Sequence, residues 1–348
     1  MPTNGQVSTS LTSSIEATIA LSTQDATHSD AALSLITHLE LYGLRCSAVL
    51  DQGNNAVQYI AIAPKDIPTL RHICGDLQQV KLIRTLGASG ESQIIIDDGS
   101  KATNRYSSVR FVPQHLDKTA SRHIQSRLST LVRYVRAWLR PNGVFCVVLG
   151  PDGVGKSTTI LRMQAELQRL LGPCRKERWR PGVVRQVTPD SSNRMPHART
   201  PRGNIASILS ILGLALDFNI GYLISAYPAM ARSETLIFDR YFHDLLIDPK
   251  RYRYSGPMGV PRSIRRLIPP RKTIFIILDA DEDVILRRKQ ELSQDELRRQ
   301  RVAYKDFSSS VSNAMIVRTD KPVDEIVAEI VDKLVTILAA QMPRWRRS

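Results

Sequence analysis

The stretch GPDGVGKST, residues 150 to 158, has the residue types and spacing of a phosphate-binding loop. It matches the pattern GxxxxGK[ST] at every fixed position, follows an apolar run and precedes a helical pattern. Its glycines permit the tight curve that turns successive backbone N–H groups toward a β-phosphate. Lys156 is expected to bridge the β- and γ-phosphates, and the Ser157 hydroxyl to bind Mg²⁺. The motif predicts an ATP site made of Gly150, Pro151, Asp152, Gly153, Val154, Gly155, Lys156, Ser157 and Thr158.

A carboxylate inside this loop, that of Asp152, is unexpected because phosphate oxygens repel it. Its presence is explained if Asp152 faces the group that receives a phosphate, or the metal ion. Asp152 is therefore a candidate catalytic residue. The alternative is an Asp that only forms the turn.

The run ETLIFDRY, residues 234 to 241, ends an apolar strand pattern in Asp239 and Arg240. Asp239 is a candidate ligand of Mg²⁺, usually through water, and Arg240 can clamp phosphoryl oxygens. The alternative for Asp239 is a cap on the next helix.

A basic cluster between residues 281 and 304 predicts a mobile lid of two short helices. Guanidinium groups over the triphosphate would neutralise the transferred group and exclude water. Arg287 and Arg288 are the catalytic candidates, and Arg298 is a candidate ATP contact. The alternative is a set of surface ion pairs of little energetic consequence with Glu282, Glu291, Asp295 and Glu296.

The elements that must position these side chains are apolar runs separated by helical patterns. Runs at 144–150, 235–239, 273–279 and 314–317 read as strands covered on both faces. Strands alternating with helices predict a doubly wound parallel sheet with ligands at the carboxyl ends of the strands. The fold class is therefore α/β: a P-loop NTPase sheet with a helical lid, preceded by a smaller N-terminal α/β domain.

The expected organisation has five parts. Residues 1–30 are rich in Ser and Thr and are predicted to be a disordered tail. Residues 31–115 read as a small α/β domain with helices near 33–41 and 67–77 and strands at 56–63, 92–97 and 108–112. Residues 116–141 predict a basic amphipathic linker helix, 142–340 the P-loop domain and 341–348 a basic tail.

The apolar segment at 205–230 raises the question of a membrane span. Asp217 and Asn219 near its middle would be costly in lipid, so a helix buried between domains or in a homodimer contact is favoured. Pro228 is expected to bend or end this helix.

The net charge of +15 favours anionic partners such as nucleotides, phosphosugars or an acidic membrane surface. Aromatic residues at base-stacking spacing among basic ones are missing, so nucleic acid is not expected as a partner. The four cysteines form no CxxC pair, and the N-terminus has no basic residue before Arg45. These features predict a cytoplasmic protein.

With these pieces, residues 143 to 340 resemble the thymidylate kinase family of P-loop nucleoside monophosphate kinases. The resemblance rests on the xDGxGKST loop, the DRY sequence at Asp239 to Tyr241 and the arginine-bearing lid. The whole layout is similar to thymidylate-kinase-like proteins of bacterial polysaccharide gene clusters, through WRPG at 179–182, DRYxxDLLxDPxRYR at 239–253 and RKxEL at 288–292. The resemblance implies transfer of the γ-phosphate of ATP, with Mg²⁺, to a dTMP-like acceptor. It also implies a weak adenine-binding role for the loop at Arg318.

Two departures from the thymidylate kinase pattern bear on the acceptor. Glu291 stands where a second lid Arg is usual, and the insertion HDLLIDPKRYRYSGP follows the DRY sequence. His243, Asp244, Asp248 and Arg251 in that insertion could shape an acceptor site for a sugar or phosphosugar, or form a salt-bridged joint. In WRPG, Trp179 and Arg180 could clamp an acceptor or pack a domain contact.

The N-terminal unit is similar to the nucleotidyltransferase-like domains that precede such kinases. The two metal-binding carboxylates of that chemistry would fall at Ala56 and Gln58, which cannot bind metal. The unit would then act in recognition or assembly, with an unrelated α/β domain as the alternative. For the whole chain, a non-catalytic ATP-binding sensor or assembly protein docked through PRWRRS, residues 343–348, remains the competing hypothesis to a kinase.

Overall fold

A computed structural model describes residues 46–50, 57–62, 80–86, 91–97, 106–113, 131–132, 134–178, 180, 200, 202–270, 272–289 and 293–341. The chain divides into two compact units, one of residues 1–142 with 334–348 and one of residues 143–333. The expected tail at 1–30, the helices near 33–41 and 67–77, Trp179, Glu291 and the basic end 342–348 lie outside the described residues.

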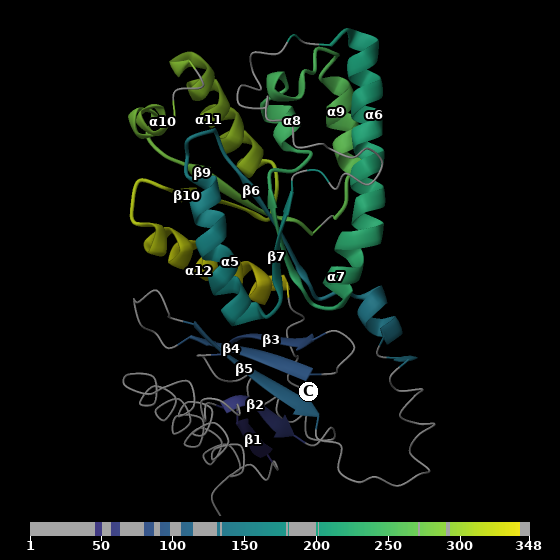
Figure 1. Cartoon of the computed structure of the whole chain (residues 1–348), viewed down its shortest axis with the longest axis vertical. Helices are drawn as coiled ribbons and strands as arrows, with labels where there is room; N and C mark the ends of the chain where they lie inside the picture. The colour runs from purple at the N-terminus through teal and green to yellow at the C-terminus, as the bar shows by residue number, and fades with distance from the viewer. Residues whose placement is uncertain are drawn as a thin grey trace, which may run out of the picture. The chain divides into compact units, whose positions relative to one another are not determined.

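The larger unit is built on the predicted parallel sheet. Its five strands lie in the order β10-β9-β6-β8-β7, and every neighbouring pair is parallel (Figure 1). Four of them match the apolar runs in the sequence: β6 (Val144–Leu149), β8 (Thr235–Asp239), β9 (Ile274–Asp279) and β10 (Ala314–Arg318). The α/β fold class predicted for this part of the chain is confirmed.

The fifth strand, β7 (Cys174–Arg178), was not predicted. Its sequence, CRKER, has no apolar run; β7 lies at the edge of the sheet, where β8 is its one neighbour among the described strands. An edge strand has one open side where charged side chains remain in water. A strand with so many charged residues cannot be recognised from the hydrophobicity of its sequence.

Both faces of the central strand β6 are buried, which explains its uninterrupted apolar sequence. Phe145, Val147 and Leu149 alternate along one face and join a core cluster with residues of α6 (Asn204–Gly221) and α11 (Gln294–Ser309). Helix α5 (Lys156–Leu171) contacts β6, β7 and β8 and buries Ile160, Met163 and Leu167. The phosphate loop is thus held between a fully buried strand and a packed helix.

The described residues after β7 contain five further helices. They are α7 (Tyr227–Ala231), α8 (Asp244–Ile247), α9 (Gly259–Ile264), α10 (Glu282–Arg288) and α12 (Val323–Gln341), with single 3₁₀ turns at Lys250–Tyr252 and Arg265–Leu267. Helices α10 and α11 form the predicted two-helix lid segment. Residues 290–292, between these helices, are not described.

The apolar segment around 205–230 is one continuous helical stretch. Pro228 does not end it; a π-helical turn at Tyr222–Ala226 precedes Pro228 and the chain continues as α7. Asp217 is buried and ion-paired with Arg180 at 2.6 Å, so its charge is satisfied inside the protein. Among the described residues, Asn204–Ala231 is the one helix long and apolar enough to cross a membrane.

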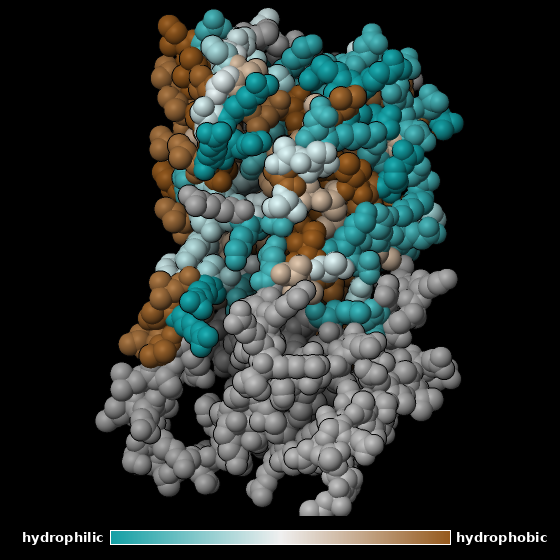
Figure 2. Space-filling model, turned by 180° about the vertical axis from the view of Figure 1, so that it is seen from behind, coloured by the Kyte–Doolittle hydropathy of each residue, from teal (hydrophilic) through white to brown (hydrophobic). Residues whose placement is uncertain are grey.

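This helix is buried on one side and open on the other. The opposite face of α6 exposes Ile205, Leu209, Leu212 and Leu216, and Figure 2 shows apolar side chains gathered in a column there. A homodimer contact on this face stays a prediction.

The N-terminal unit contains a second sheet in the order β1-β2-β5-β4-β3. The predicted strands appear as β2 (Val57–Ile62), β4 (Glu91–Asp97) and β5 (Tyr106–Pro113), and the structure adds β1 (Cys46–Leu50) and β3 (Val80–Leu86). Only the β2–β5 pair is parallel among these described strands. Of the predicted linker helix, residues 131–132 and 134–139 are described and are helical.

Candidate active site

The backbone of the phosphate loop has the shape that its glycines permit. Gly150, Gly153 and Gly155 have φ angles of 146°, 88° and 98°, which residues with a side chain rarely adopt. A Cβ atom on Gly150 would lie 2.6 Å from the carbonyl oxygen of Leu278 in β9. Glycine at position 150 is therefore required by the close approach of β9 as well as by the turn.

The amino end of α5 is open to an anion. No side chain caps it, and its first turn contains no acidic residue. Its first N–H groups have no partner within the helix and point along the positive end of the helix dipole. Ser157 and Thr158 are exposed in this turn, so their hydroxyls are available to a ligand.

Lys156 lies inside the curve of the loop rather than in solvent. Its ammonium group donates to the carbonyl oxygens of Gly150 (2.8 Å) and Pro151 (2.7 Å) and lies 3.6 Å from Asp152 Oδ1. Burial, with the charge of Arg240, lowers the pKa of Lys156 to about 7 against the opposing effect of the nearby carboxylates. A bound triphosphate would restore the charged form, because it adds negative charge next to the ammonium group.

Asp152 joins the phosphate loop to the segment after β8. Its Oδ1 accepts a hydrogen bond from Arg240 Nη2, and its Oδ2 accepts one from Arg251 Nη1, both at 2.5 Å. Burial opposes ionisation, but the charges of Arg240, Lys156 and Arg251 outweigh it and hold the pKa of Asp152 far below its usual range. Asp152 is thus more than a turn-forming residue: as a permanent anion it orients two guanidinium groups beside the loop.

Asp244 binds Arg240 from the other side. Arg240 Nη1 donates to Asp244 Oδ2 at 2.5 Å, and the Tyr252 and Tyr304 hydroxyls donate to the same carboxylate at 2.9 and 2.6 Å. Asp244 is completely buried, and although burial raises its pKa, Arg240 and the Tyr304 hydrogen bond lower it by more. With Lys156, Asp152, Arg240 and Arg251, it forms a network of three basic groups and two carboxylates next to the phosphate loop.

Arg240 has an unusual backbone, with φ at 71°. Its N–H donates to the carbonyl oxygen of Val148 on β6, at 3.0 Å, which turns the chain sharply as β8 ends. The turn aims the guanidinium at Asp152 rather than along the strand. A non-glycine residue in this conformation costs free energy, and such strain is concentrated at functional sites.

Asp239 precedes Arg240 at the carboxyl end of β8, opposite Val148 of β6 in the sheet register. Its nearest charged partner is Lys176 on β7, at 3.8 Å, and its side chain is 27% exposed. A partly exposed carboxylate whose nearest ion pair is 3.8 Å long, and an exposed hydroxyl in the first turn of an uncapped helix, are suitable ligands for an octahedral Mg²⁺ that keeps several waters. Ser157 and Asp239 remain the predicted Mg²⁺ ligands. No cluster of three or more His, Cys, Asp or Glu side chains occurs in the described part of the chain, and such a Mg²⁺ site needs none.

Of the predicted lid arginines, Arg288 lies against the phosphate loop. A Cβ atom on Gly155 would be 3.7 Å from Arg288 Nη1, and Arg288 Nη2 donates to the carbonyl oxygen of Thr319. Thr319 in turn donates its hydroxyl to the carbonyl oxygen of Val154 at 2.7 Å. The loop after β10 is thereby tied to both the lid and the phosphate loop.

The other predicted lid and base-binding residues form ion pairs or local hydrogen bonds. Arg298 is exposed and pairs with Glu282, Arg287 donates to the carbonyl oxygen of Asp283, and Arg318 pairs with Asp281 and Asp320. Arg301 binds Asp279 through two hydrogen bonds, and Arg299 pairs with Glu296. Glu282 and Glu296 form the ion pairs with lid arginines that the sequence analysis gave as the alternative. Contact of Arg287, Arg298 or Arg318 with ATP stays a prediction.

The four insertion residues do not form one site. Asp244 and Arg251 join the Asp152 network, and Asp248 Oδ1 accepts a hydrogen bond from the backbone N–H of Arg251. His243 is buried among the rings of Tyr241, Phe275 and Phe307 instead. Arg180 of the WRPG sequence binds Asp217 of α6, which is the packing role considered for it.

Tyr252 and Tyr304 were not assigned roles from the sequence, and Thr319 was considered only as part of the loop that follows the last strand. Their hydroxyls act through contacts between residues 8 to 165 positions apart, which no local pattern reveals. For Tyr304 the available signal was its spacing of seven residues from Leu297 and three from Phe307, which puts the three side chains on one face of the helix.

Comparisons with known proteins add little beyond the fold. No protein-family model and no curated protein matches this chain. Among solved structures, thymidylate kinase from Ehrlichia chaffeensis is similar, with 14% sequence identity and a TM-score of 0.42 over 56% of this chain and 100% of that chain. A likeness of this strength does not decide a reaction. The parallel sheet and the loop between β6 and α5 are what make this unit a P-loop domain.

Proposed function

We propose that the chain is an ATP- and Mg²⁺-dependent phosphotransferase of the thymidylate kinase type, which transfers the γ-phosphate of ATP to a nucleoside monophosphate. The observation behind this proposal is the pair of guanidinium groups, Arg240 and Arg251, bound to Asp152 inside the phosphate loop. A loop that only binds a nucleotide does not require two guanidinium groups held in this way. Two guanidiniums beside the triphosphate are suited to a second phosphorylated ligand.

In this reaction each residue has a separable task. Lys156 and the N–H groups of α5 bind the β- and γ-phosphates, and Ser157 and Asp239 hold Mg²⁺, which supplies charge neutralisation when bound. Arg240 and Arg251 orient the acceptor phosphate, with N–H groups beyond those bonded to Asp152 and Asp244. Arg288 stabilises the charge on the transferred group from the lid side.

The bonds formed and broken in this transfer are balanced without a dedicated general base. An oxygen of the acceptor phosphate forms a bond to the γ-phosphorus while the bond from that phosphorus to the β,γ-bridging oxygen breaks, and ADP leaves with the electron pair. A phosphate monoester is already largely deprotonated at pH 7, so positioning and neutralisation are the main requirements.

A phosphosugar acceptor in polysaccharide biosynthesis is the second candidate. The observation that favours it is the origin of Arg251 and Tyr252, which come from the insertion absent from ordinary thymidylate kinases and lie in the acceptor-side network. A third candidate is a non-catalytic ATP-binding assembly protein on an acidic membrane surface. Its support is that Arg240 is already bound by two carboxylates. All three place the chain in the cytoplasm.

The test is ADP release by the full chain with Mg²⁺-ATP and a panel of nucleoside monophosphates and sugar phosphates. We expect turnover that depends on one acceptor class, a KM for that acceptor raised at least about tenfold in Arg251→Ala, and ATP affinity unchanged. Lys250→Ala is the matched control, because Lys250 is exposed and adjacent. Tight ATP binding without acceptor-dependent turnover on any panel member would refute the kinase proposal and favour the assembly protein.

A further inference from the structure

A second cavity of about 520 Å³ lies away from the phosphate loop. Its lining includes Thr273, which precedes β9, and residues 310–313, which precede β10. The phosphate loop instead follows the carboxyl end of β6, which runs parallel to β9. The cavity therefore reaches the amino ends of β9 and β10, whereas the predicted ATP site lies at the carboxyl ends of the parallel strands.

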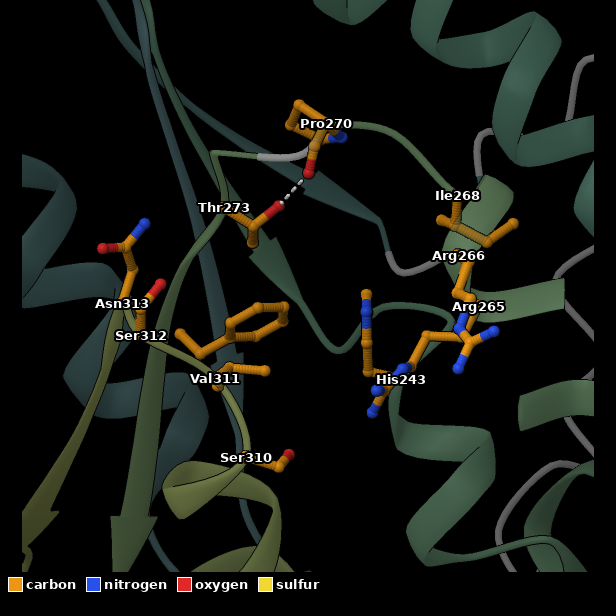
Figure 3. A pocket seen from close by; sticks show the side chains of 11 residues that line it. His243, Arg265, Arg266, Ile268, Pro270, Thr273, Ser310, Val311, Ser312 and Asn313 are labelled. Carbon is orange, nitrogen blue, oxygen red and sulfur yellow. Dashed lines mark hydrogen bonds between the residues drawn. The ribbon is translucent and has the colours of Figure 1, made fainter. Parts of the chain in front are cut away.

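One wall of this cavity contains an unsatisfied buried histidine. His243 is 8% exposed, and its Nδ1 has no hydrogen-bond partner among the described residues. Figure 3 shows the imidazole projecting toward the cavity from the segment that precedes α8. A buried polar atom without a partner in a folded protein needs an explanation, and a ligand in the cavity supplies one.

The same wall has two positive charges. Arg265 and Arg266 line the cavity, and neither forms an ion pair with a described residue. No acidic side chain is among the described residues that line it. Burial and the charge of Arg265 lower the pKa of His243 to about 3, so the imidazole is neutral at pH 7 and one of its nitrogens is a donor.

The opposite wall is uncharged and has both polar and apolar residues. Ser310, Val311, Ser312 and Asn313 come from the turn between α11 and β10 and line the cavity on the side across from His243 (Figure 3). Guanidinium groups bind phosphate oxygens through paired hydrogen bonds, and hydroxyl and amide groups suit a polyol. The volume exceeds what a bare phosphate needs and leaves room for a sugar-sized group.

We propose that this cavity is a second ligand site that binds a small phosphomonoester of sugar size, with the phosphate at Arg265, Arg266 and His243 and the polyol at the 310–313 turn. The site is independent of the proposed phosphotransfer. It uses none of the residues of the phosphate loop or of the Asp152 network.

The experiment is a titration of the full chain with glucose 1-phosphate, followed through the side-chain ¹⁵N resonances of His243. These are assigned by their loss in His243→Gln. A site-specific signal is needed because phosphate esters would also bind near Lys156. Glucose and inorganic phosphate serve as comparison ligands.

We expect a saturable shift of the Nδ1 resonance with glucose 1-phosphate, weaker binding of inorganic phosphate and no shift with glucose. The double variant Arg265→Gln/Arg266→Gln should weaken binding at least about tenfold. Arg262→Gln is the control, because Arg262 is exposed on α9 and does not line the cavity. If the double variant is poorly folded, the single variant Arg266→Gln, at an exposed position, tests whether the cavity arginines bind the phosphate ester.

Three results would overturn the proposal. The first is a His243 resonance that does not respond to glucose 1-phosphate. The second is equal affinity in wild type and in both arginine variants. The third is inorganic phosphate binding as tightly as the ester, which would leave the 310–313 turn without a role.

Discussion

Replacement of Asp244 by asparagine tests the charge network on which the candidate site depends. Asp244 is fully buried and accepts hydrogen bonds from Arg240, Tyr252 and Tyr304. Asn keeps the shape but removes the charge, and its NH₂ group replaces one of the two accepting oxygens, facing either Tyr304 or the pair Arg240 and Tyr252. Removing one partner of a buried ion pair costs about 3 to 5 kcal/mol. Because Arg240 keeps Asp152, we expect the lower end, about 3 kcal/mol.

The assay is amide hydrogen exchange of peptides covering β6 and β8, which reports opening of this unit alone. A loss of about 3 kcal/mol corresponds to exchange faster by more than about 100-fold. The double variant Asp244→Asn/Arg240→Gln removes the unpaired charge and should recover about 2 kcal/mol relative to the sum of the two single variants.

Asp306→Asn on α11 is the matched control, because Asp306 is exposed; its effect should stay within about 0.5 kcal/mol. The reasoning is refuted if Asp244→Asn costs less than about 1 kcal/mol, or if the double variant shows strictly additive losses.

Three further outcomes are expected. Gly150→Ala should abolish binding of a non-hydrolysable ATP analogue in calorimetry, because of its φ of 146° and the Leu278 carbonyl, whereas Gly213→Ala in α6, with nothing within 4 Å, should leave binding intact. Arg288→Ala should lower kcat at least about tenfold and Arg298→Ala less than about threefold; equal effects would contradict the different placement of these side chains. The lowered pKa of His243 makes the neutral form the stable one in the fold, so stability is fully present above pH 6.5 and is lost as pH falls toward about 3. Measured by hydrogen exchange, the loss of unfolding free energy should approach about 1.4 kcal/mol per pH unit. A His243→Gln protein with the same dependence of stability on pH would disprove the assignment to His243.

Much of the larger unit could be predicted from local pattern. Strands β6, β8 and β9 could be predicted because both faces of the sheet are covered there, so each is a nearly continuous apolar run. The edge strand β10 also has an apolar run, although alternate residues are partly exposed. The other edge strand, β7, could not be predicted because its sequence, CRKER, contains no apolar run. In the N-terminal unit the pattern missed β1 and β3, because their sequences, CSAVL and VKLIRTL, have neither a clean alternation nor an uninterrupted apolar run.

The lid shows where residue type is an incomplete guide to role. Arg288 and Arg298 are equally basic in the sequence, yet one lies beside Gly155 and the other pairs with Glu282 on the surface. The difference arises because Glu282 on α10 faces Arg298 and Arg301 on α11, a relation set by how the two helices pack. Spacing along one helix does not contain that information.

The sequence by itself determined the phosphate loop, the strands that flank it and the positions of Asp239 and Arg240 at a strand end, because these depend on residues close together in the chain. The tertiary structure decided which charges meet. Asp152 and Arg251 are 99 positions apart, and Asp244 and Tyr304 are 60 apart, yet each pair forms a hydrogen bond. The tertiary structure also separated His243 from its neighbour Asp244, since a sharp turn after β8 sends one side chain to the second cavity and the other to the phosphate loop. Coulombic attraction and burial act between atoms that are close in space, so only the folded chain specifies them.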